Sequence, residues 1–266
     1  MLTAEQVEFF HRNGYVRGGK LLELDEVHEL RERLDAVLAG KSDTGGRVEY
    51  AATIENKDPA VGGVLQVVNI WKQDSVFRRH HSRPALVEMA RQLTGTPVLR
   101  IFHDQILSKP PRNGRPVNWH QDYGYWQMVT PADLITCWVA LDDATIANGC
   151  MQVIPGSHRW GLLAANTNLG DDDPEAILKL VSLPPGEKLE KVAIELPAGH
   201  CMWHHCLTLH GTDVNRTDKP RRAVITHLMP GHCRYDSRYE HLMGQFAEAE
   251  GLRHGDVLRG AHFPEV

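Results

Sequence analysis

The chain has 266 residues, of which 42% are hydrophobic and 24% charged, a composition that fits one large domain with a sizeable core. Its formal net charge of −5 argues against recruitment of nucleic acid by a general basic field. No signal-peptide pattern and no apolar stretch of about 18 residues is visible, so no membrane partner is expected. The five cysteines lack CxxC spacing, which predicts reduced, mostly structural thiols in a cytoplasmic protein.

The start of the chain is predicted to be helical. Thr3 and Gln6 have the spacing of a capping box, and Gly14 follows as the stop. A second helix is predicted over residues 21–38, where leucines and one valine recur at helical spacing. Residues 40–60 are rich in Gly, Asp and Lys and are expected to form an exposed loop.

The next part of the chain alternates between strand and helix patterns. Strands are predicted at 64–71 and 98–108. Between them, residues 76–93 predict a helix that breaks before Pro84. The basic run Arg78–Arg83 within this helix is interpreted as a solvated face.

Short apolar runs bounded by Gly and Pro dominate the rest of the chain. They predict strands at 135–141, at 151–154 and from residue 192 onward. Residues 164–190 break this rhythm, and we interpret them as a lid or rim loop with a short helix at 174–182.

This element order predicts the fold class. Many short strands, with helices collected at one end, indicate a mainly β protein with flanking α-helices. The architecture we expect is a double-stranded β-helix (jelly roll) with N-terminal helices packed outside. We expect a single domain over 1–266, with a helical N-terminal part (about 1–95), a jelly-roll core (about 96–230) and a C-terminal tail (231–266).

A candidate metal site is centred on the run VNWHQDYGYW, residues 117–126. It places His120 and Asp122 two residues apart in a pattern that indicates an extended strand, where such residues share a face. A third ligand must come from elsewhere, and His210 in LTLHGT is the candidate. Two His and one carboxylate with open positions form the usual ligand set of non-haem Fe(II) oxygenases. Alone, the His-x-Asp pair is equally compatible with a buried hydrogen-bonded pair in a sheet.

Other histidines in the chain are interpreted as non-ligands. His254 and Asp256 form a second His-x-Asp, but they lie in a polar, glycine-bounded stretch that we interpret as a surface loop. His200, His204 and His205 precede His210. Because six residues of straight strand span about 20 Å, His204 is expected to lie far from His210 and to serve in packing or in lining a pocket.

Arg221 follows His210 by eleven residues, in the run HGTDVNRTDKPRRAVITHL. With this run the sequence resembles the phytanoyl-CoA dioxygenase family of Fe(II)- and 2-oxoglutarate-dependent oxygenases, which includes the ectoine hydroxylases. The resemblance spans nearly the whole chain and rests on LTAEQVEFFHRNGYV, DQILSKPP, WHQDYGYW, NGCMQVIPGSHRWG and HGTxxN with the following Arg. It implies that His120, Asp122 and His210 hold iron and that Arg221 binds the far carboxylate of 2-oxoglutarate. Arg222 is the competitor, because strand alternation turns only one of the pair inward.

The resemblance also implies further contacts. The cofactor-binding set expected from it is Arg221, Gln105, Lys109, Trp126 and Thr212, although Trp126 alone would more often be core and Lys109 surface. The expected substrate-binding set is Tyr125, Asn69 and Trp71.

The resulting functional expectation is an Fe(II)- and 2-oxoglutarate-dependent oxygenase that hydroxylates a small organic metabolite. Such an enzyme would use dioxygen, convert 2-oxoglutarate to succinate and CO2, and act as a monomer or small homo-oligomer. Asp122 favours hydroxylation, because a halogenase of this kind would have a small residue there.

Three alternatives remain open. One is an acyl-CoA hydroxylase of the same family, for which Lys109, Arg112 and Arg115 would supply charge near the entrance. The net acidic chain and the aromatic run Tyr123–Met128 favour a free small molecule instead. The second is a cupin-like zinc hydrolase or isomerase, which would have no need of Arg221. The third is a cupin-like binding protein without oxygenase activity, in which a ligand or the Arg should be missing.

Overall fold

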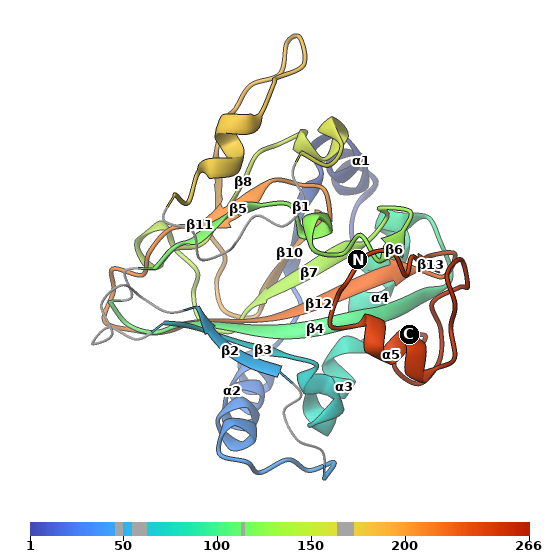
Figure 1. Ribbon diagram of the computed structural model, residues 1–266. Helices are drawn as coiled ribbons and strands as arrows, with labels where there is room; N and C mark the ends of the chain where they lie inside the picture. Colours follow the sequence, from blue (N-terminus) through green and yellow to red (C-terminus); the bar gives the residue numbers. More distant parts are fainter. Residues whose placement is uncertain (46–49, 55–62, 113–114, 164–172) are drawn as a thin grey trace.

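The computed structural model describes residues 1–45, 50–54, 63–112, 115–163 and 173–266. Two antiparallel sheets face each other and form the body of the molecule (Figure 1). The larger sheet has the order β1-β10-β7-β12-β4-β3-β2, and the smaller has the order β5-β11-β8-β9. This arrangement confirms the predicted jelly roll with flanking helices.

The bounds of the strands are as follows. The larger sheet contains β1 (Tyr15–Lys20), β10 (His200–His205), β7 (Ile135–Ala140), β12 (Arg221–Pro230), β4 (Leu99–Lys109), β3 (Val64–Val68) and β2 (Tyr50–Ile54). The smaller sheet contains β5 (Val117–His120), β11 (His210–Thr212), β8 (Met151–Val153) and β9 (Val192–Ile194). A short separate ladder joins β6 (Val129–Thr130) to β13 (Arg234–Tyr235).

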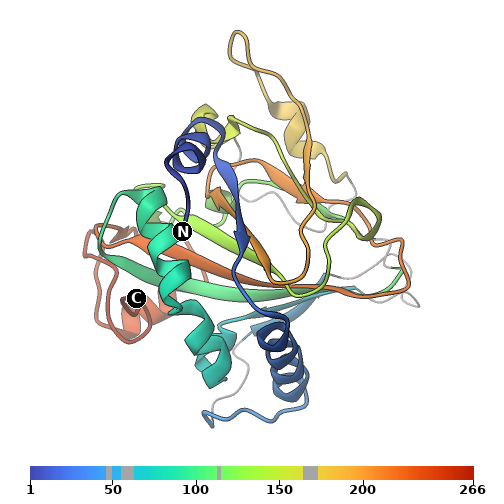
Figure 2. The same cartoon turned by 180° about the vertical axis from the view of Figure 1, so that it is seen from behind.

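The helices of the N-terminal part of the chain cover the outer face of the larger sheet (Figure 2). The α-helices are α1 (Ala4–Asn13), α2 (Leu24–Leu38), α3 (Ser75–His81), α4 (Pro84–Thr94) and α5 (Gly244–Ala249). The 3-10 turns are η2 (Ile70–Lys72), η3 (Asp122–Gly124), η4 (Ile146–Asn148), η5 (Ser157–Trp160) and η6 (Ala176–Leu180). Apolar residues of α1 to α4 pack with the outward residues of β4, β7, β10 and β12 in one continuous core.

Strand alternation divides each central strand between this outer core and the interior between the sheets. In β12, Val224 packs in the outer core, whereas its neighbours Ala223 and Ile225 pack in the inner cluster. In β7, Val139 faces outward and Trp138 inward. The inward positions of the larger sheet therefore form one wall of a cavity, and the smaller sheet forms the opposite wall.

Several predicted elements are correct, and others end early. Thr3 and Gln6 form the predicted capping box, and Gly14 caps α1. The helix predicted at 21–38 begins at Leu24. The strand predicted over 64–71 ends at Val68, because Asn69 has a left-handed backbone (φ 60°) and η2 follows.

Two loop predictions are only partly correct. The segment 40–60 contains β2, although residues 46–49 and 55–60 lie outside the described residues. In the segment 164–190, residues 164–172 also lie outside them. The remainder contains the predicted short helix as the 3-10 turn η6 and projects from the body of the molecule (Figure 1).

The basic run in α3 is only partly a solvated face, which corrects the prediction. Arg78 and Arg79 are exposed, but the adjacent His80 and His81 are buried. His81 contacts the Asp104 carboxylate at 2.6 Å through Nε2. This buried interaction helps fasten α3 to β4, so the run is amphipathic rather than wholly solvated.

The remaining expectations concern the thiols and the membrane. All five cysteines are buried and unbridged, as predicted for structural thiols. Within the described ranges, no helix combines the length and apolar character needed to cross a bilayer.

The turn at Gly149 allows the backbone carbonyl of Asp213 to lie close to it. Replacing Gly149 or Gly95 by Ala should cost about 1–2 kcal/mol, because both have left-handed φ angles. At Gly149 the new Cβ would also lie 2.2 Å from the Asp213 carbonyl oxygen, whereas at Gly95 it meets nothing within 4 Å. We therefore expect Gly149→Ala to lose about 1–3 kcal/mol more than Gly95→Ala in urea unfolding. Equal losses would contradict this close approach.

Candidate active site

The smaller sheet brings two histidines together. β11 pairs with β5 in antiparallel register, and His210 lies directly opposite His120. Their ring centroids are 4.2 Å apart. His210, which was predicted as the third ligand from a distant part of the sequence, thus contacts His120 directly across two paired strands.

Asp122 joins the two histidines, although not by the strand alternation expected from sequence. β5 ends at His120, and Asp122 is the first residue of η3. The turn places its Oδ1 3.5 Å from Nε2 of His120 and 3.5 Å from Nε2 of His210. The same-face prediction for the pair was correct in outcome but wrong in its reason.

The donor atoms of His120 and His210 are oriented for a metal. His120 donates from Nδ1 to the Asn118 carbonyl at 2.7 Å, and His210 donates from Nδ1 to the Thr208 carbonyl at 2.9 Å. Because a carbonyl only accepts, each Nδ1 carries the proton and each Nε2 presents its lone pair to the centre. Burial also lowers the pKa of His210 well below its usual range, which favours the neutral ligand form.

The two oxygens of Asp122 have different surroundings. Oδ2 accepts from Thr136 Oγ1 at 3.2 Å and from His204 Nε2 at 3.0 Å. Oδ1 is turned to the two ligand imidazoles. Burial would raise the pKa of Asp122, but its histidine neighbours, among them His210 and the donor His204, hold it well below its usual range. The group is therefore an ionised carboxylate with one oxygen anchored and one available.

This donor set fits a divalent metal. One ligand atom from each residue of the triad lies within 4.8 Å of the others. Ligands about 2.1 Å from one ion and about 90–110° apart are separated by about 3.0–3.5 Å, which matches the 3.5 Å spacings here. Two neutral imidazoles and one carboxylate on a single side leave the remaining coordination positions open.

His204 lies beside the triad, which corrects the expected separation of about 20 Å. Its ring centroid is 4.4 Å from that of His210. The chain reverses between β10 and β11, and the two strands belong to different sheets, so the straight-strand estimate does not apply. The interpretation of His204 as a pocket-lining residue is correct.

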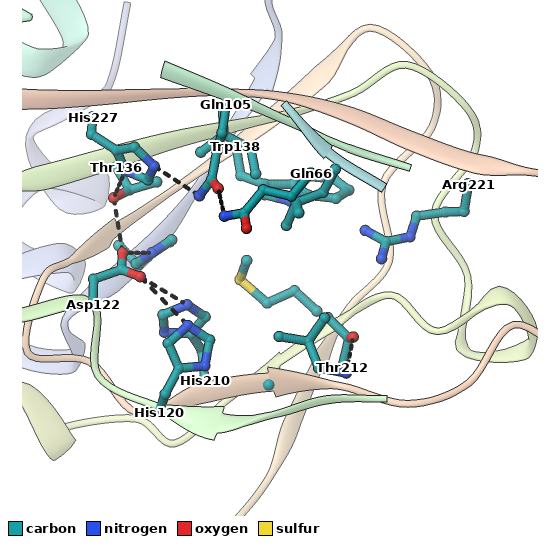
Figure 3. Close-up of a pocket in the computed structure, with 16 residues that line it drawn as sticks. Gln66, Gln105, His120, Asp122, Thr136, Trp138, His210, Thr212, Arg221 and His227 are labelled. Atoms are coloured by element: carbon teal, nitrogen blue, oxygen red, sulfur yellow. Dashed lines mark hydrogen bonds and ion pairs between the residues drawn. The ribbon is translucent and has the colours of Figure 1, made fainter. Parts of the chain in front are cut away.

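Arg221 lies at the opposite end of the same pocket from the triad (Figure 3). Its side chain is fully buried, and its three guanidinium nitrogens have no hydrogen-bond partner in the described part of the chain. Burial lowers the pKa of Arg221 to about 10, so the group stays charged at neutral pH. An unpaired buried cation is costly, and an anion that enters the pocket would neutralise it.

Arg222 points away from the pocket, as alternation requires. Its Nε and Nη2 donate to the two carboxylate oxygens of Asp142 at 2.9 and 3.0 Å. Asp142 also pairs with Arg31 at 2.8 Å. The guanidinium of Arg222 is therefore already neutralised, and Arg221 alone of the pair is available to a ligand.

The other expected cofactor contacts lie in three different places. Thr212 and Gln105 line the pocket with Arg221. Trp126 lines an adjoining pocket instead, with its ring centroid 4.5 Å from that of His227. Lys109 is buried and donates to the Asp213 carbonyl, so it is neither a surface residue nor part of either pocket's lining.

Of the three expected substrate contacts, the structure brings one to the site. Tyr125 lines the adjoining pocket, with its ring centroid 6.0 Å from that of His120. Trp71 instead lines a separate depression with Lys72 and Arg78, and Asn69 lines neither pocket of the site. Both residues follow the end of β3 at Val68, and their roles in substrate binding stay predictions.

Sequence reasoning missed five polar residues that line the two pockets around the triad. These are Gln66, Thr136 and His227 in the first pocket, and His103 and His241 in the adjoining one. Alternation alone could have placed Thr136 inward, because ITCWVAL is a recognisable strand. Nothing local to the sequence indicates that His227 lies opposite Thr136.

Comparisons with known proteins agree with this geometry. The family described as Phytanoyl-CoA dioxygenase (PhyH) matches residues 10–223. A probable phytanoyl-CoA dioxygenase of Caenorhabditis elegans is 27% identical over 245 residues, covering 88% of this chain and 78% of the relative. The non-heme alpha ketoglutarate dependent carbocyclase SnoK from nogalamycin biosynthesis superposes with a TM-score of 0.76 at 27% identity, covering 100% of this chain and 96% of that one. The epimerase SnoN, solved in complex with Fe3+, alpha ketoglutarate and nogalamycin RO, superposes with a TM-score of 0.75 at 26% identity, covering 98% of this chain and 97% of that one.

Removing one ligand should weaken metal binding strongly. We expect His210→Ala to bind Mn(II) at least about 10–100-fold more weakly than the unaltered protein, the loss typical even of groups that only orient ligands. Anaerobic titration followed by the Mn(II) paramagnetic resonance signal measures this. His254→Ala, in the second His-x-Asp on the surface, is the matched control and should bind as before. Unchanged binding by His210→Ala would disprove the ligand assignment.

Proposed function

This chain belongs to the phytanoyl-CoA dioxygenase family, and from that premise we propose that it oxidises a free small organic molecule with Fe(II), 2-oxoglutarate and dioxygen. It is a 2-oxoglutarate-dependent oxygenase, as are its relatives. The observation that carries the residue assignment is the unpaired, buried guanidinium of Arg221, which shares one pocket with the His120–Asp122–His210 triad.

Each side chain of the site has a role that follows from its surroundings. His120, Asp122 and His210 would hold the iron, which when bound supplies the oxidation chemistry that side chains lack. Arg221 would bind the far carboxylate of 2-oxoglutarate, because its planar fork matches a carboxylate and stays charged. Thr212 lies in the same pocket, and its hydroxyl oxygen accepts from the backbone N–H of Val117 at 3.2 Å. Because this bond uses only an acceptor position, the O–H of Thr212 can still donate to that carboxylate.

The walls of this pocket also exclude water from the reacting groups. Trp138, Met151 and Ile225 line it between Arg221 and the triad. Their apolar surfaces strengthen the attraction between the guanidinium and an entering carboxylate, because charge interactions are weakly screened where water is absent. The overall reaction would convert 2-oxoglutarate to succinate and CO2 while the substrate is oxidised.

The adjoining pocket supports a small, uncharged substrate. It has a volume of about 300 Å³ and reaches Asp122, so its occupant would lie beside the metal. Apart from that ligand, its described lining carries no charged side chain: burial lowers the pKa of His241 to about 4 and that of His103 well below its usual range. Trp126 and Tyr125 offer ring faces, and Gln66 and Gln105 offer amide groups.

The positions of the cationic side chains expected near the pocket entrance give little support to a coenzyme A thioester as the substrate. Lys109 is buried against the Asp213 carbonyl. Arg112 is exposed and paired with Asp218. Neither of these, nor Arg115, belongs to the described lining of the two pockets. A ligand with several phosphate charges would therefore find no prepared cluster there.

The zinc-protein alternative explains less of the site. A zinc hydrolase or isomerase would use the triad but would leave the Arg221 charge unneutralised. A binding protein without activity would have no reason to keep all four groups in one pocket. The cytoplasmic location, the use of dioxygen and the monomeric or small homo-oligomeric state stay predictions.

Arg221 should dominate cosubstrate affinity. We expect Arg221→Ala to weaken binding of 2-oxoglutarate by about 2–5 kcal/mol, the usual loss when one partner of a buried charge pair is removed. Calorimetric titration of the Mn(II)-loaded protein measures it. Arg222→Ala is the matched control, and it should bind 2-oxoglutarate nearly as before, because Arg222 is committed to Asp142. A loss at Arg222 equal to that at Arg221 would reverse the assignment.

The substrate class can be tested by turnover. We expect uncharged ring-containing natural-product scaffolds to stimulate succinate formation more than free amino acids, small acids or fatty acyl-CoAs, because the described lining offers no partner for their charges. Succinate released per mole of compound oxidised measures the coupling. Tight coupling with an acyl-CoA, lost when the coenzyme is removed, would contradict the proposed class while leaving the oxygenase assignment intact.

A further inference from the structure

A continuous chain of hydrogen bonds runs from the adjoining pocket to the metal carboxylate (Figure 3). Gln66 Nε2 lies 2.6 Å from Gln105 Oε1, and Gln105 Nε2 lies 2.9 Å from His227 Nε2. His227 Nδ1 lies 2.8 Å from Thr136 Oγ1, which lies 3.2 Å from Asp122 Oδ2. Before Asp122, the members come from β3, β4, β12 and β7, four strands of the larger sheet. We call them, with Asp122, the relay.

The relay has one consistent hydrogen-bond direction. An ionised carboxylate only accepts, so the Thr136 hydroxyl donates to Asp122 and must accept from His227 Nδ1. Burial lowers the pKa of His227 to about 3, so the ring is neutral and its Nε2 accepts from the Gln105 amide. The Gln105 carbonyl then accepts from Gln66. Every donor therefore points toward Asp122 Oδ2.

The register of the larger sheet accounts for this alignment. His227 lies directly opposite Thr136 in the β12–β7 pairing. Gln105 lies opposite Ile225, two residues from His227 on the same strand and therefore diagonal to it. A hydroxyl that has only one partner can rotate, whereas Thr136 is held from both sides.

We propose that His227 is a positioning residue that holds the Thr136 hydroxyl on Asp122 Oδ2, and thereby keeps Asp122 Oδ1 turned to the metal. The inference rests on the proposed metal site. His227 itself touches neither the metal ligand nor the ligand histidines by hydrogen bond; it acts through Thr136. Outer partners of this kind commonly contribute about 10–100-fold to metal affinity.

The far end of the relay also links the metal site to the substrate. Gln66 and Gln105 line both the Arg221 pocket and the adjoining pocket. A substrate that exchanges hydrogen bonds with either amide would change the donor that fixes His227. Through the relay, a substrate bound in the adjoining pocket would therefore change the hydrogen bonds that orient Asp122.

The alternative is that His227 is only a buried polar residue whose hydrogen bonds are satisfied. Its replacement would then reduce stability without a specific effect on the metal. Two pairs of variants separate these roles. Thr136→Val and His227→Leu remove the donors, whereas Thr136→Ser and His227→Asn retain a donor at nearly the same place.

The experiment is an anaerobic titration of the full chain with Mn(II), followed by paramagnetic resonance, together with urea unfolding of each variant. We expect Thr136→Val and His227→Leu to bind Mn(II) about 10–100-fold more weakly. Thr136→Ser and His227→Asn should restore most of the affinity. Gln105→Met, which removes the donor to His227, should show a smaller loss in the same direction.

A matched control corrects for lost packing. Val224→Ala is on the same strand as His227, is equally buried and faces the outer core, so it should reduce stability without changing Mn(II) affinity. If His227→Leu does not fold, Thr136→Val decides the question by the same measurement, because it is nearly isosteric. Wild-type affinity in Thr136→Val, or in a folded His227→Leu, would overturn the inference.

The outcome also separates this inference from the proposed function. If the unaltered protein binds Mn(II) no better than His210→Ala, the metal site itself is wrong. If the unaltered protein binds tightly and His210→Ala does not, the metal site stands. The relay variants then test the role of His227 alone.

Discussion

The carboxylate of Asp122 is held by both sheets at once, and the arrangement of the site depends on this. Its Oδ2 accepts from Thr136 and His204, which stand on β7 and β10 of the larger sheet. Its Oδ1 faces the imidazoles of His120 and His210, from β5 and β11 of the smaller sheet. The larger sheet therefore fixes one oxygen of Asp122 while the smaller sheet supplies the imidazoles that face the other, so packing between the sheets is coupled to the orientation of this carboxylate.

The second constraint is the buried charge of Arg221. A guanidinium without a partner is unfavourable in a folded protein, and most proteins neutralise such a group internally. Here Arg222, its neighbour, is neutralised by Asp142, while Arg221 faces an apolar pocket. The fold thus retains an electrostatic cost that a dicarboxylate would relieve on binding. In the function we propose, this would be the physical basis for selecting 2-oxoglutarate over a neutral ligand.

The two pockets divide the work of the site. The one that contains Arg221 has a fixed cation and suits an anionic cosubstrate, whereas the described lining of the other is neutral apart from Asp122. Gln66 and Gln105 border both, and through His227 and Thr136 they are linked by hydrogen bonds to Asp122.

The sequence by itself determined the ligand types and their order. A His-x-Asp pair, a distant His and an Arg eleven residues beyond it are local patterns, and the alternation of Arg221 and Arg222 already required one of them to face inward. Only the tertiary structure decided what surrounds them. His204 and Thr136 reach Asp122, and His227 reaches Thr136, because strands far apart in sequence pair in one sheet. Strand register and chain reversal are set by packing between the sheets, which no short stretch of sequence contains.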